Sequence, residues 1–264
     1  MTIAFSENKN TGSRPLVLIH AFPLDRRMWD HQVKGLENTI RVIAPDTPGF
    51  GNSDRLSEKP SMRAYVNSWL QFLDDREIEQ AVFGGCSMGG YILFELWRQA
   101  PERTAGLILW DTRADADAPD ARENRLQTIE EVQANGPASL AETMPAKLLS
   151  PATYETRPDL VDELKKTILA NPKDGIADAL QALADRPDST DTLKTITAPT
   201  LILVGEDDVL TPPELAQSMH AHITNSRLEI IPQAGHLSPL EQPDKTNAII
   251  ESFLREASLL PKNA

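Results

Sequence analysis

Short apolar runs recur along the chain, and each is followed by turn residues and then by a stretch with helical periodicity. The runs are rich in leucine and β-branched residues and are apolar at successive positions, which is typical of strands buried between two helical layers. We therefore predict strands at 16–20, 40–44, 81–83, 105–110, 201–204 and 228–231. Because strands and helices alternate, the pattern predicts an α/β fold with a mostly parallel, doubly wound sheet and right-handed crossovers.

Two helices outside these strands have clear boundaries in the sequence. Ser61 is a candidate N-cap for a helix whose apolar residues recur at intervals of three and four positions. A similar apolar face begins after Pro243 and predicts a closing helix. The first dozen residues show no clear pattern.

The stretch from 113 to 197 interrupts the alternation, because no run in it has the pattern of a strand. Apolar residues at helical spacing predict four helices, around 126–132, 140–148, 160–168 and 176–183. Prolines lie near their starts, where a missing N–H costs little: Pro119, Pro137, Pro158 and Pro172. We therefore predict a core formed by residues 1–112 and 198–264, with an inserted all-helical cap at 113–197.

Composition narrows the function classes. The chain has 264 residues, 40% hydrophobic and 25% charged, which is ordinary for a globular protein. Its formal charge of −13 disfavours nucleic acids and anionic membranes as partners. The N-terminus has neither a basic start nor a continuous apolar stretch, so we expect no export signal and a cytoplasmic location. The single cysteine, Cys86, excludes an internal disulfide bond.

A candidate nucleophile lies at Gly85-x-Ser87-x-Gly89, after one predicted strand and before a helical run. This is the strand–turn–helix context of a nucleophile elbow, in which a tight turn strains the serine backbone and requires small neighbours. The hydroxyl then projects at a helix N-terminus, which favours developing negative charge. A glycine-rich turn without catalytic function is the alternative interpretation.

A serine nucleophile needs a base and an orienting acid. His236 follows the last predicted strand, and Asp208 follows the strand at 201–204, so both are expected at the same sheet edge as Ser87. Asp111, at the end of the strand 105–110, is a competing acid whose alternative role is to hold a loop through backbone N–H groups. The remaining histidines have no evident partners, and no cluster of Cys or His predicts a metal; we expect no cofactor.

Catalysis by a serine also needs donors for an oxyanion. The loop His20-Ala21-Phe22-Pro23 follows the first strong strand, and the N–H groups of Phe22 and Met88 are the predicted donors. His20 is expected to brace this loop rather than to act as an acid or base.

Five segments, in fixed order, resemble the α/β-hydrolase family: HAFPLDRRMW, DTPGFGNSD, GGCSMGGY, PTLILVGEDDVLTPP and AGHLSPLEQP. Within the family the likeness is to small bacterial esterases and 3-oxoadipate enol-lactonase-like hydrolases. The resemblance implies that Ser87 is the nucleophile, His236 the base and Asp208 the acid, with 113–197 in the position of the helical cap. The sequence departs from the family in having only fourteen residues before Pro15, so we expect a shortened N-terminal hairpin and a strand missing from the sheet. Enol-lactonases of the family carry a cap tryptophan, whereas 113–197 contains one aromatic residue, Tyr154.

The leading hypothesis is a serine hydrolase that cleaves small carboxylic esters or lactones through an acyl-enzyme. Enol-lactonase, C–C bond hydrolase, acyl transfer and perhydrolase activities use the same machinery and remain alternatives, whereas dehalogenation requires a carboxylate in place of Ser87. A ligand receptor built on the same fold is the non-enzymatic alternative. Cys86, which directly precedes Ser87, is expected to point into the packing beneath the turn.

Overall fold

A seven-stranded sheet forms the centre of the computed structural model, which describes residues 1–12 and 14–260. Its strands are β1 (Phe5–Glu7), β2 (Leu16–Ile19), β3 (Val42–Pro45), β4 (Ala81–Cys86), β5 (Thr104–Trp110), β6 (Thr200–Gly205) and β7 (Ser226–Ile231). Their order across the sheet is β1-β3-β2-β4-β5-β6-β7. All neighbours are parallel except β1, which pairs antiparallel with β3. The predicted mostly parallel α/β sheet is therefore confirmed.

The six strands predicted from apolar runs are all present, with ends shifted by up to three residues. Strand β1 was not predicted, and the N-terminal segment contributes this one strand in place of a hairpin. Strand β7 also differs from the expectation, because it is only partly buried. It lies at the edge of the sheet, and Ile230 is 41% exposed. An edge strand is covered less completely than a central one, which explains the difference.

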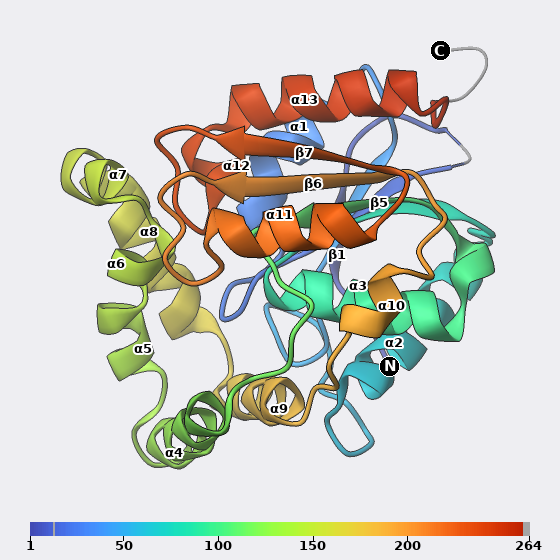
Figure 1. Ribbon diagram of the computed structural model, residues 1–264. Helices are drawn as coiled ribbons and strands as arrows, with labels where there is room; N and C mark the ends of the chain where they lie inside the picture. Colours follow the sequence, from blue (N-terminus) through green and yellow to red (C-terminus); the bar gives the residue numbers. More distant parts are fainter. Residues whose placement is uncertain (13, 261–264) are drawn as a thin grey trace.

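Helices cover both faces of the sheet, as Figure 1 shows. On one face lie α1 (Asp30–Gly35) and α13 (Pro243–Glu256), which pack together. On the other face lie α2 (Met62–Asp74), α3 (Met88–Gln99) and α11 (Pro213–His222). The remaining helical turns of this part are η1 (Arg26–Trp29), η2 (Pro101–Arg103) and α12 (Ser238–Glu241). Helix α2 starts where the sequence predicts, since the Ser61 hydroxyl accepts a hydrogen bond from Ala64 N–H at 3.1 Å.

The stretch 113–197, named here the helical segment, contains helices and connecting loops but no strand. Its helices are α4 (Pro119–Asn135), α5 (Ala138–Thr143), α6 (Pro145–Leu148), α7 (Pro151–Thr156), α8 (Pro158–Ala170), α9 (Lys173–Ala184) and α10 (Thr190–Leu193). The helix predicted around 140–148 is wrong in one respect, because it divides at Pro145, which lacks the N–H that a continuous helix needs. The short helices α7 and α10 were not predicted.

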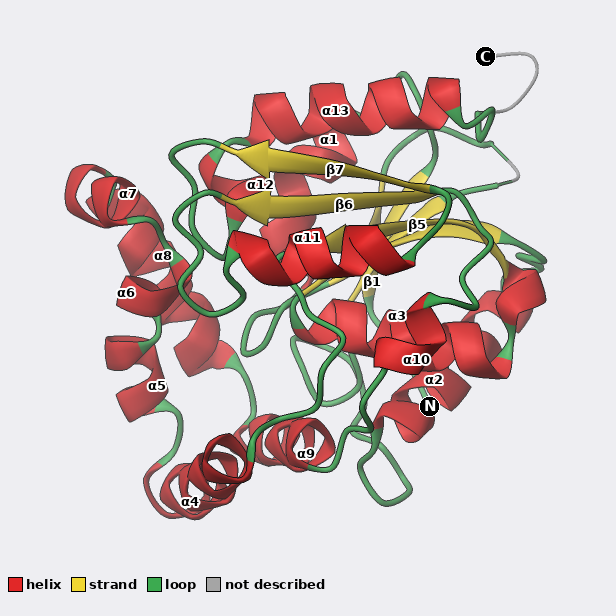
Figure 2. Ribbon diagram, viewed as in Figure 1, coloured by secondary structure: helices red, strands yellow, loops and turns green. Residues whose placement is uncertain are grey.

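The helical segment lies beside the carboxyl ends of the parallel strands. In Figure 2, strands β6 and β7 point toward the side on which α5 to α8 are stacked. Helices α4 and α9 pack against each other, as do α5 and α8, whereas α10 packs against α3 and α11. Residues that follow the strands therefore meet the helical segment. Within residues 1–12 and 14–260, no helix is long and apolar enough to cross a membrane.

The helical segment lies very close to a sheet loop at Gly175, in the first turn of α9. A β-carbon at this position would lie 1.8 Å from the carbonyl oxygen of Gly49, which itself has a positive φ of 88°. Two glycines thus allow the backbones of α9 and the loop after β3 to touch.

This contact predicts that Gly175→Ala destabilises the protein. Alanine in a helix normally gains up to about 1 kcal/mol over glycine, but the clash with Gly49 should reverse the sign and lower the free energy of unfolding by about 1–3 kcal/mol. Chemical denaturation of the two proteins measures the difference. Lys173→Ala, at an exposed position two residues earlier, is the matched control; a Gly175→Ala protein at least as stable as the wild type would contradict the close approach.

Candidate active site

Ser87 lies in the turn between β4 and α3, where its backbone has φ 53° and ψ −109°. A β-carbon at Gly85 would lie 2.4 Å from the carbonyl carbon of Gly89, and one at Gly89 would lie 2.4 Å from the carbonyl oxygen of Ile19. Only glycine fits at either position, as the sequence pattern requires. Ser87 N–H donates to the Trp110 carbonyl at 2.9 Å, which fixes the turn to the neighbouring strand.

His236 and Asp208 come together at the same edge of the sheet. Nδ1 of His236 lies 2.8 Å from Oδ2 of Asp208, and both side chains are almost completely buried. The hydroxyl of Thr211 donates to the same Asp208 oxygen at 2.7 Å and lies 3.2 Å from His236 Nδ1. Because Nδ1 faces the carboxylate, Nε2 is the ring nitrogen left for proton transfer.

The surroundings of Asp208 favour its ionised form. Burial by itself raises the pKa of this carboxyl, but the charge and hydrogen bond of His236 and the hydrogen bonds of Thr211 outweigh burial and hold its pKa below the usual value. The backbone N–H groups of Leu210 and Thr211 also donate to Oδ1, each at 2.9 Å. Thr211 is a site residue that the sequence reasoning missed, although the turn sequence Leu210-Thr211-Pro212 directly after Asp208 was a signal for it.

Asp111, the competing acid, accepts hydrogen bonds from two loops. Its Oδ1 accepts from Gly205 N–H at 2.7 Å, and its Oδ2 accepts from the Ser238 hydroxyl at 2.7 Å. Burial, followed by repulsion from Asp208, raises the pKa of Asp111 well above the usual value in spite of these donors. Asp111 thus joins the loops that carry Asp208 and His236, which matches the loop-holding alternative stated for it.

The loop after β2 carries the predicted oxyanion donor Phe22. Among the described residues, no acceptor is found for the N–H of Phe22 or for that of Met88, the first residue of α3. Both residues line the same cavity as Ser87. Ala21 is completely buried, and its N–H donates to the sulfur of Met28 at 3.2 Å.

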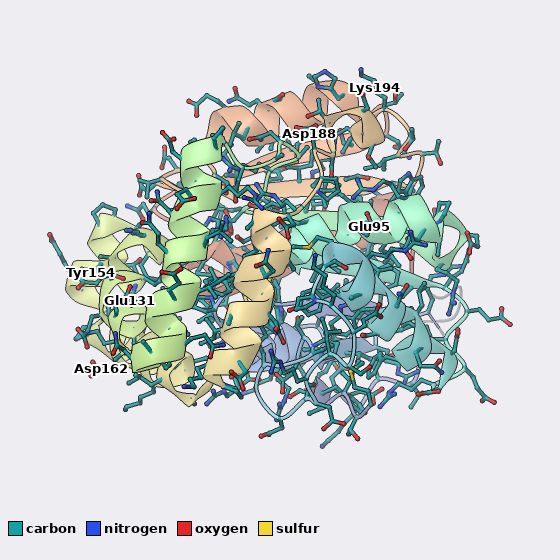
Figure 3. All side chains as sticks on the ribbon, turned by 90° about the horizontal axis from the view of Figure 1, so that it is seen from below. Glu95, Glu131, Tyr154, Asp162, Asp188 and Lys194 are labelled. Atoms are coloured by element: carbon teal, nitrogen blue, oxygen red, sulfur yellow. The ribbon has the colours of Figure 1, made fainter. Side chains whose placement is uncertain are left out.

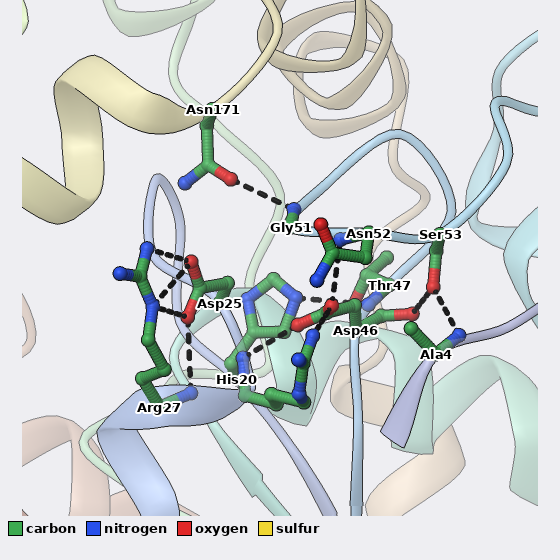
Figure 4. A network of polar contacts seen from close by, with 11 residues as sticks. Ala4, His20, Asp25, Arg27, Asp46, Thr47, Gly51, Asn52, Ser53 and Asn171 are labelled. Carbon is green, nitrogen blue, oxygen red and sulfur yellow. Dashed lines mark hydrogen bonds and ion pairs between the residues drawn. The ribbon is translucent and has the colours of Figure 1, made fainter. Parts of the chain in front are cut away.

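His20 braces this loop through both ring nitrogens, and Figure 4 shows its hydrogen bond to Thr47. Its Nε2 accepts a hydrogen bond from Thr47 N–H at 2.9 Å, so the ring proton sits on Nδ1, which donates to the Ala21 carbonyl at 3.0 Å. Burial lowers the pKa of His20, which keeps the ring neutral in this role. The neighbouring carboxylate of Asp46 accepts from the backbone N–H groups of Arg26 and Asn52, each at 2.9 Å. The loop after β2 and the loop after β3 are thereby joined by buried polar groups.

Cys86 is completely buried, as expected, and its thiol lies 3.7 Å from the His236 carbonyl. Burial, with smaller effects of Asp111 and Asp208, raises the pKa of the thiol well above its usual value. The side chain therefore packs beneath the turn as a small apolar group.

A cavity of about 370 Å³ joins these groups to the helical segment. Ser87, His236, Thr211, Phe22 and Met88 line its floor, and residues of α4, α5, α6 and α9 form its walls. Its volume is that of a site for a small molecule. In the part of the chain that the structure describes, no three His, Cys, Asp or Glu side chains lie close enough together to hold a metal ion.

Comparison with known proteins gives the same family from two directions. A family model described as the alpha/beta hydrolase fold matches residues 14–243. The chain is 30% identical to 3-oxoadipate enol-lactonase 1 of Acinetobacter baylyi, over 96% of this chain and 93% of that protein. It is 26% identical to a pimeloyl-[acyl-carrier protein] methyl ester esterase of Nitrosomonas europaea, over 90% of this chain and 94% of that one.

Solved structures of other proteins have the same fold. A thermophilic esterase from Thermogutta terrifontis, in a malate-bound structure, superposes with a TM-score of 0.93 at 40% identity, covering 97% of this chain and 93% of that one. An enol-lactonase from Burkholderia xenovorans has the same fold, with a TM-score of 0.87 at 23% identity over 96% of this chain and 96% of its own length. The family model spans most of the chain, and the strand order, the turn at Ser87 and these relatives all agree with it: the chain belongs to the α/β-hydrolase family.

Proposed function

We propose that this protein is a serine hydrolase that cleaves small carboxylic esters or lactones through an acyl-enzyme. One observation carries the proposal: the strained Ser87 turn and His236, which is paired with Asp208, line one cavity, beside two N–H groups for which the described residues offer no acceptor. Relatives named as esterases and enol-lactonases support it. The helical segment acts as the cap in this proposal.

In the proposed reaction, the Ser87 oxygen attacks the carbonyl carbon of the substrate while Nε2 of His236 takes its proton. Asp208 keeps the imidazole in the tautomer with a proton on Nδ1 and stabilises the positive charge that develops on the ring. The N–H groups of Phe22 and Met88 bind the tetrahedral oxyanion, and loss of one such donor typically costs about 3 kcal/mol. His236 then returns the proton to the leaving alkoxide, and water cleaves the acyl-enzyme by the same steps in reverse.

Enol-lactone hydrolysis is the second candidate, because two relatives carry that name. The single aromatic residue of the helical segment, Tyr154, is 39% exposed and does not line the cavity, so it offers no substitute for a cap tryptophan. C–C bond hydrolysis, acyl transfer and perhydrolysis use the same groups and are separated by assay. A panel of p-nitrophenyl esters of increasing acyl length, together with several lactones, tests these activities. A receptor would give at most one slow burst instead of turnover.

Ser87→Ala should abolish ester turnover and leave the fold intact. The Ser87 side chain is half-buried and already lines the cavity, so loss of one hydroxyl opens no large new void. Steady-state rates with p-nitrophenyl acetate, and labelling of the wild type with a fluorophosphonate at Ser87, provide the measurement. More than trace activity in the purified variant would refute the nucleophile assignment.

Substitution of Asp208 should lower the rate much more than substitution of Asp111. Asp208→Asn should lower kcat by about 10³-fold or more, because the imidazole is then held in the wrong tautomer. Asp111→Asn should retain much more activity but lower the free energy of unfolding by about 1–3 kcal/mol, since an amide cannot accept from both Gly205 and Ser238 as the carboxylate does. Rates and denaturation curves of both variants give the comparison. The opposite ranking of the two rates would assign the acid to Asp111.

Cys86 should be unreactive in the native protein. Because burial raises the pKa of its thiol, little thiolate forms at pH 7–8, and iodoacetamide should label it slowly. Cys86→Ala should keep most of the activity and lose about 1 kcal/mol of stability through a small cavity. Rapid labelling that runs parallel to inactivation would instead place the thiol in the cavity.

A further inference from the structure

The wall that the helical segment contributes to the cavity is positively charged, in a chain whose formal charge is −13. Arg113, Arg125 and Lys147 line it, together with a single acidic side chain, Asp117, which leaves a net formal charge of +2 if His236 is neutral. The outer surface of the same helical segment is acidic; Glu131 and Asp162, labelled in Figure 3, lie on its outside. The cations in the cavity are therefore a local feature.

Asp117 holds the arginines in place without neutralising them. Its side chain is only 2% exposed and pairs with Arg113 at 2.9 Å, with Arg125 and with Arg186 at 2.7 Å. Arg186 does not line the cavity, because it packs over the ring of Tyr91 and donates to the Asp115 carbonyl. One carboxylate thus orients three guanidinium groups, two of which face the cavity.

These cations keep unused hydrogen-bond donors. Nε of Arg113 is buried without a hydrogen-bond partner, since the nearest carboxylate, that of Asp115, lies 3.6 Å away. The side-chain ammonium of Lys147 has no hydrogen-bond or ion-pair partner among residues 1–12 and 14–260, although its backbone N–H donates to the Met144 carbonyl. A buried donor without an acceptor costs about 1–3 kcal/mol, so the site is suited to a ligand that brings an acceptor.

The rest of the wall is apolar. Leucine and methionine side chains of α5, α6 and α9 and of the loop after β6 complete it: Leu140, Met144, Leu148, Leu180, Leu183 and Leu210. A ligand that fills the cavity therefore needs a short apolar stretch between the reacting group at Ser87 and an anionic end.

We propose that Arg113, Arg125 and Lys147 bind a free carboxylate of the substrate, so that this hydrolase acts on the monoesters or lactones of small dicarboxylic or hydroxy-dicarboxylic acids. This inference rests on the proposed hydrolase function. Planar guanidinium groups bind carboxylates through two parallel hydrogen bonds, and Lys147 adds a flexible charge at the rim. At physiological ionic strength charges beyond about 8 Å are screened, so the acidic outer surface does not cancel the attraction inside the cavity.

The test compares two substrates of similar size, monoethyl succinate and the neutral ethyl levulinate, by pH-stat titration. The wild type should hydrolyse the anionic ester with a kcat/KM at least about tenfold higher. Arg125→Gln should reduce that preference about tenfold, mainly through KM, and leave the rate with ethyl levulinate within about threefold. Lys147→Gln should also reduce the preference for the anionic ester. The Lys147 side chain is exposed and has no ion-pair partner among the described residues, so its replacement does not threaten folding.

Arg122→Gln is the matched control, because Arg122 lies on the same helix as Arg125 but pairs with Asp185 outside the cavity. Its substrate preference should equal that of the wild type. Equal hydrolysis of both esters by the wild type, or an equal loss in Arg122→Gln, would overturn the carboxylate site.

Calorimetric titration of the wild type with succinate separates this proposal from the hydrolase proposal. Succinate binding that Lys147→Gln and Arg125→Gln weaken, in a protein that cleaves neither ester, would support the carboxylate site and refute the proposed reaction. Hydrolysis of both esters with the same kcat/KM, without succinate binding, would refute the carboxylate site and support the proposed reaction.

Discussion

Ser87 holds a positive φ of 53° in a turn whose neighbours leave no space for a β-carbon at Gly85 or Gly89. Such a backbone costs about 1–3 kcal/mol and persists only where the surrounding structure determines it. Here the sheet does so, because β4 lies between β2 and β5. The Ser87 N–H bonds to the end of β5, and the Cα of Gly89 packs on the end of β2. The chain moves outward from β2 to β3 on one side and from β4 to β7 on the other, so the turn lies where the strand order reverses, as ligand sites in such sheets do.

Two buried aspartates near this turn have different roles, because their surroundings shift their pKa values in opposite directions. Asp208 receives the charge of His236 and the donors of Thr211, and its pKa falls; Asp111 is buried between Gly205 and Ser238, and its pKa rises. Divergent shifts of this kind are how a site assigns different tasks to the same residue type. In this protein one carboxylate faces an imidazole, and the other joins the two loops on which the imidazole and the first carboxylate lie.

Much of this arrangement follows from local patterns in the sequence. Buried parallel strands are continuous apolar runs, and their carboxyl ends fall at one edge of the sheet, so the sequence predicts that Ser87, Asp208 and His236 lie close together. Strand β1 was not predicted, because three residues are too few to show an alternating pattern and its pairing with β3 is a long-range contact. The sequence does not predict the positive cavity wall either, because Arg113, Arg125 and Lys147 are far apart in sequence and lie in a stretch whose net charge is negative. Charged residues on helices are usually solvated, and only the folded helical segment brings these three to one cavity.

The helical segment is fastened to the loops that carry the proposed catalytic groups, so the wall that meets the substrate and the floor that reacts with it are not independent. Asn171, between α8 and α9, donates to the Pro23 carbonyl at 3.0 Å and accepts from Gly51 N–H at 2.8 Å, which ties the segment to the loop of Phe22. Glu241 accepts from Ser150 N–H at 2.9 Å and from Gly235 N–H at 2.7 Å, which ties it to the loop of His236. These groups are buried, and each donor or acceptor left unpaired would cost about 1–3 kcal/mol. A rigid-body opening of the whole segment would break both connections at once. A change of conformation in a wall side chain, such as the exposed Lys147, would leave both connections intact.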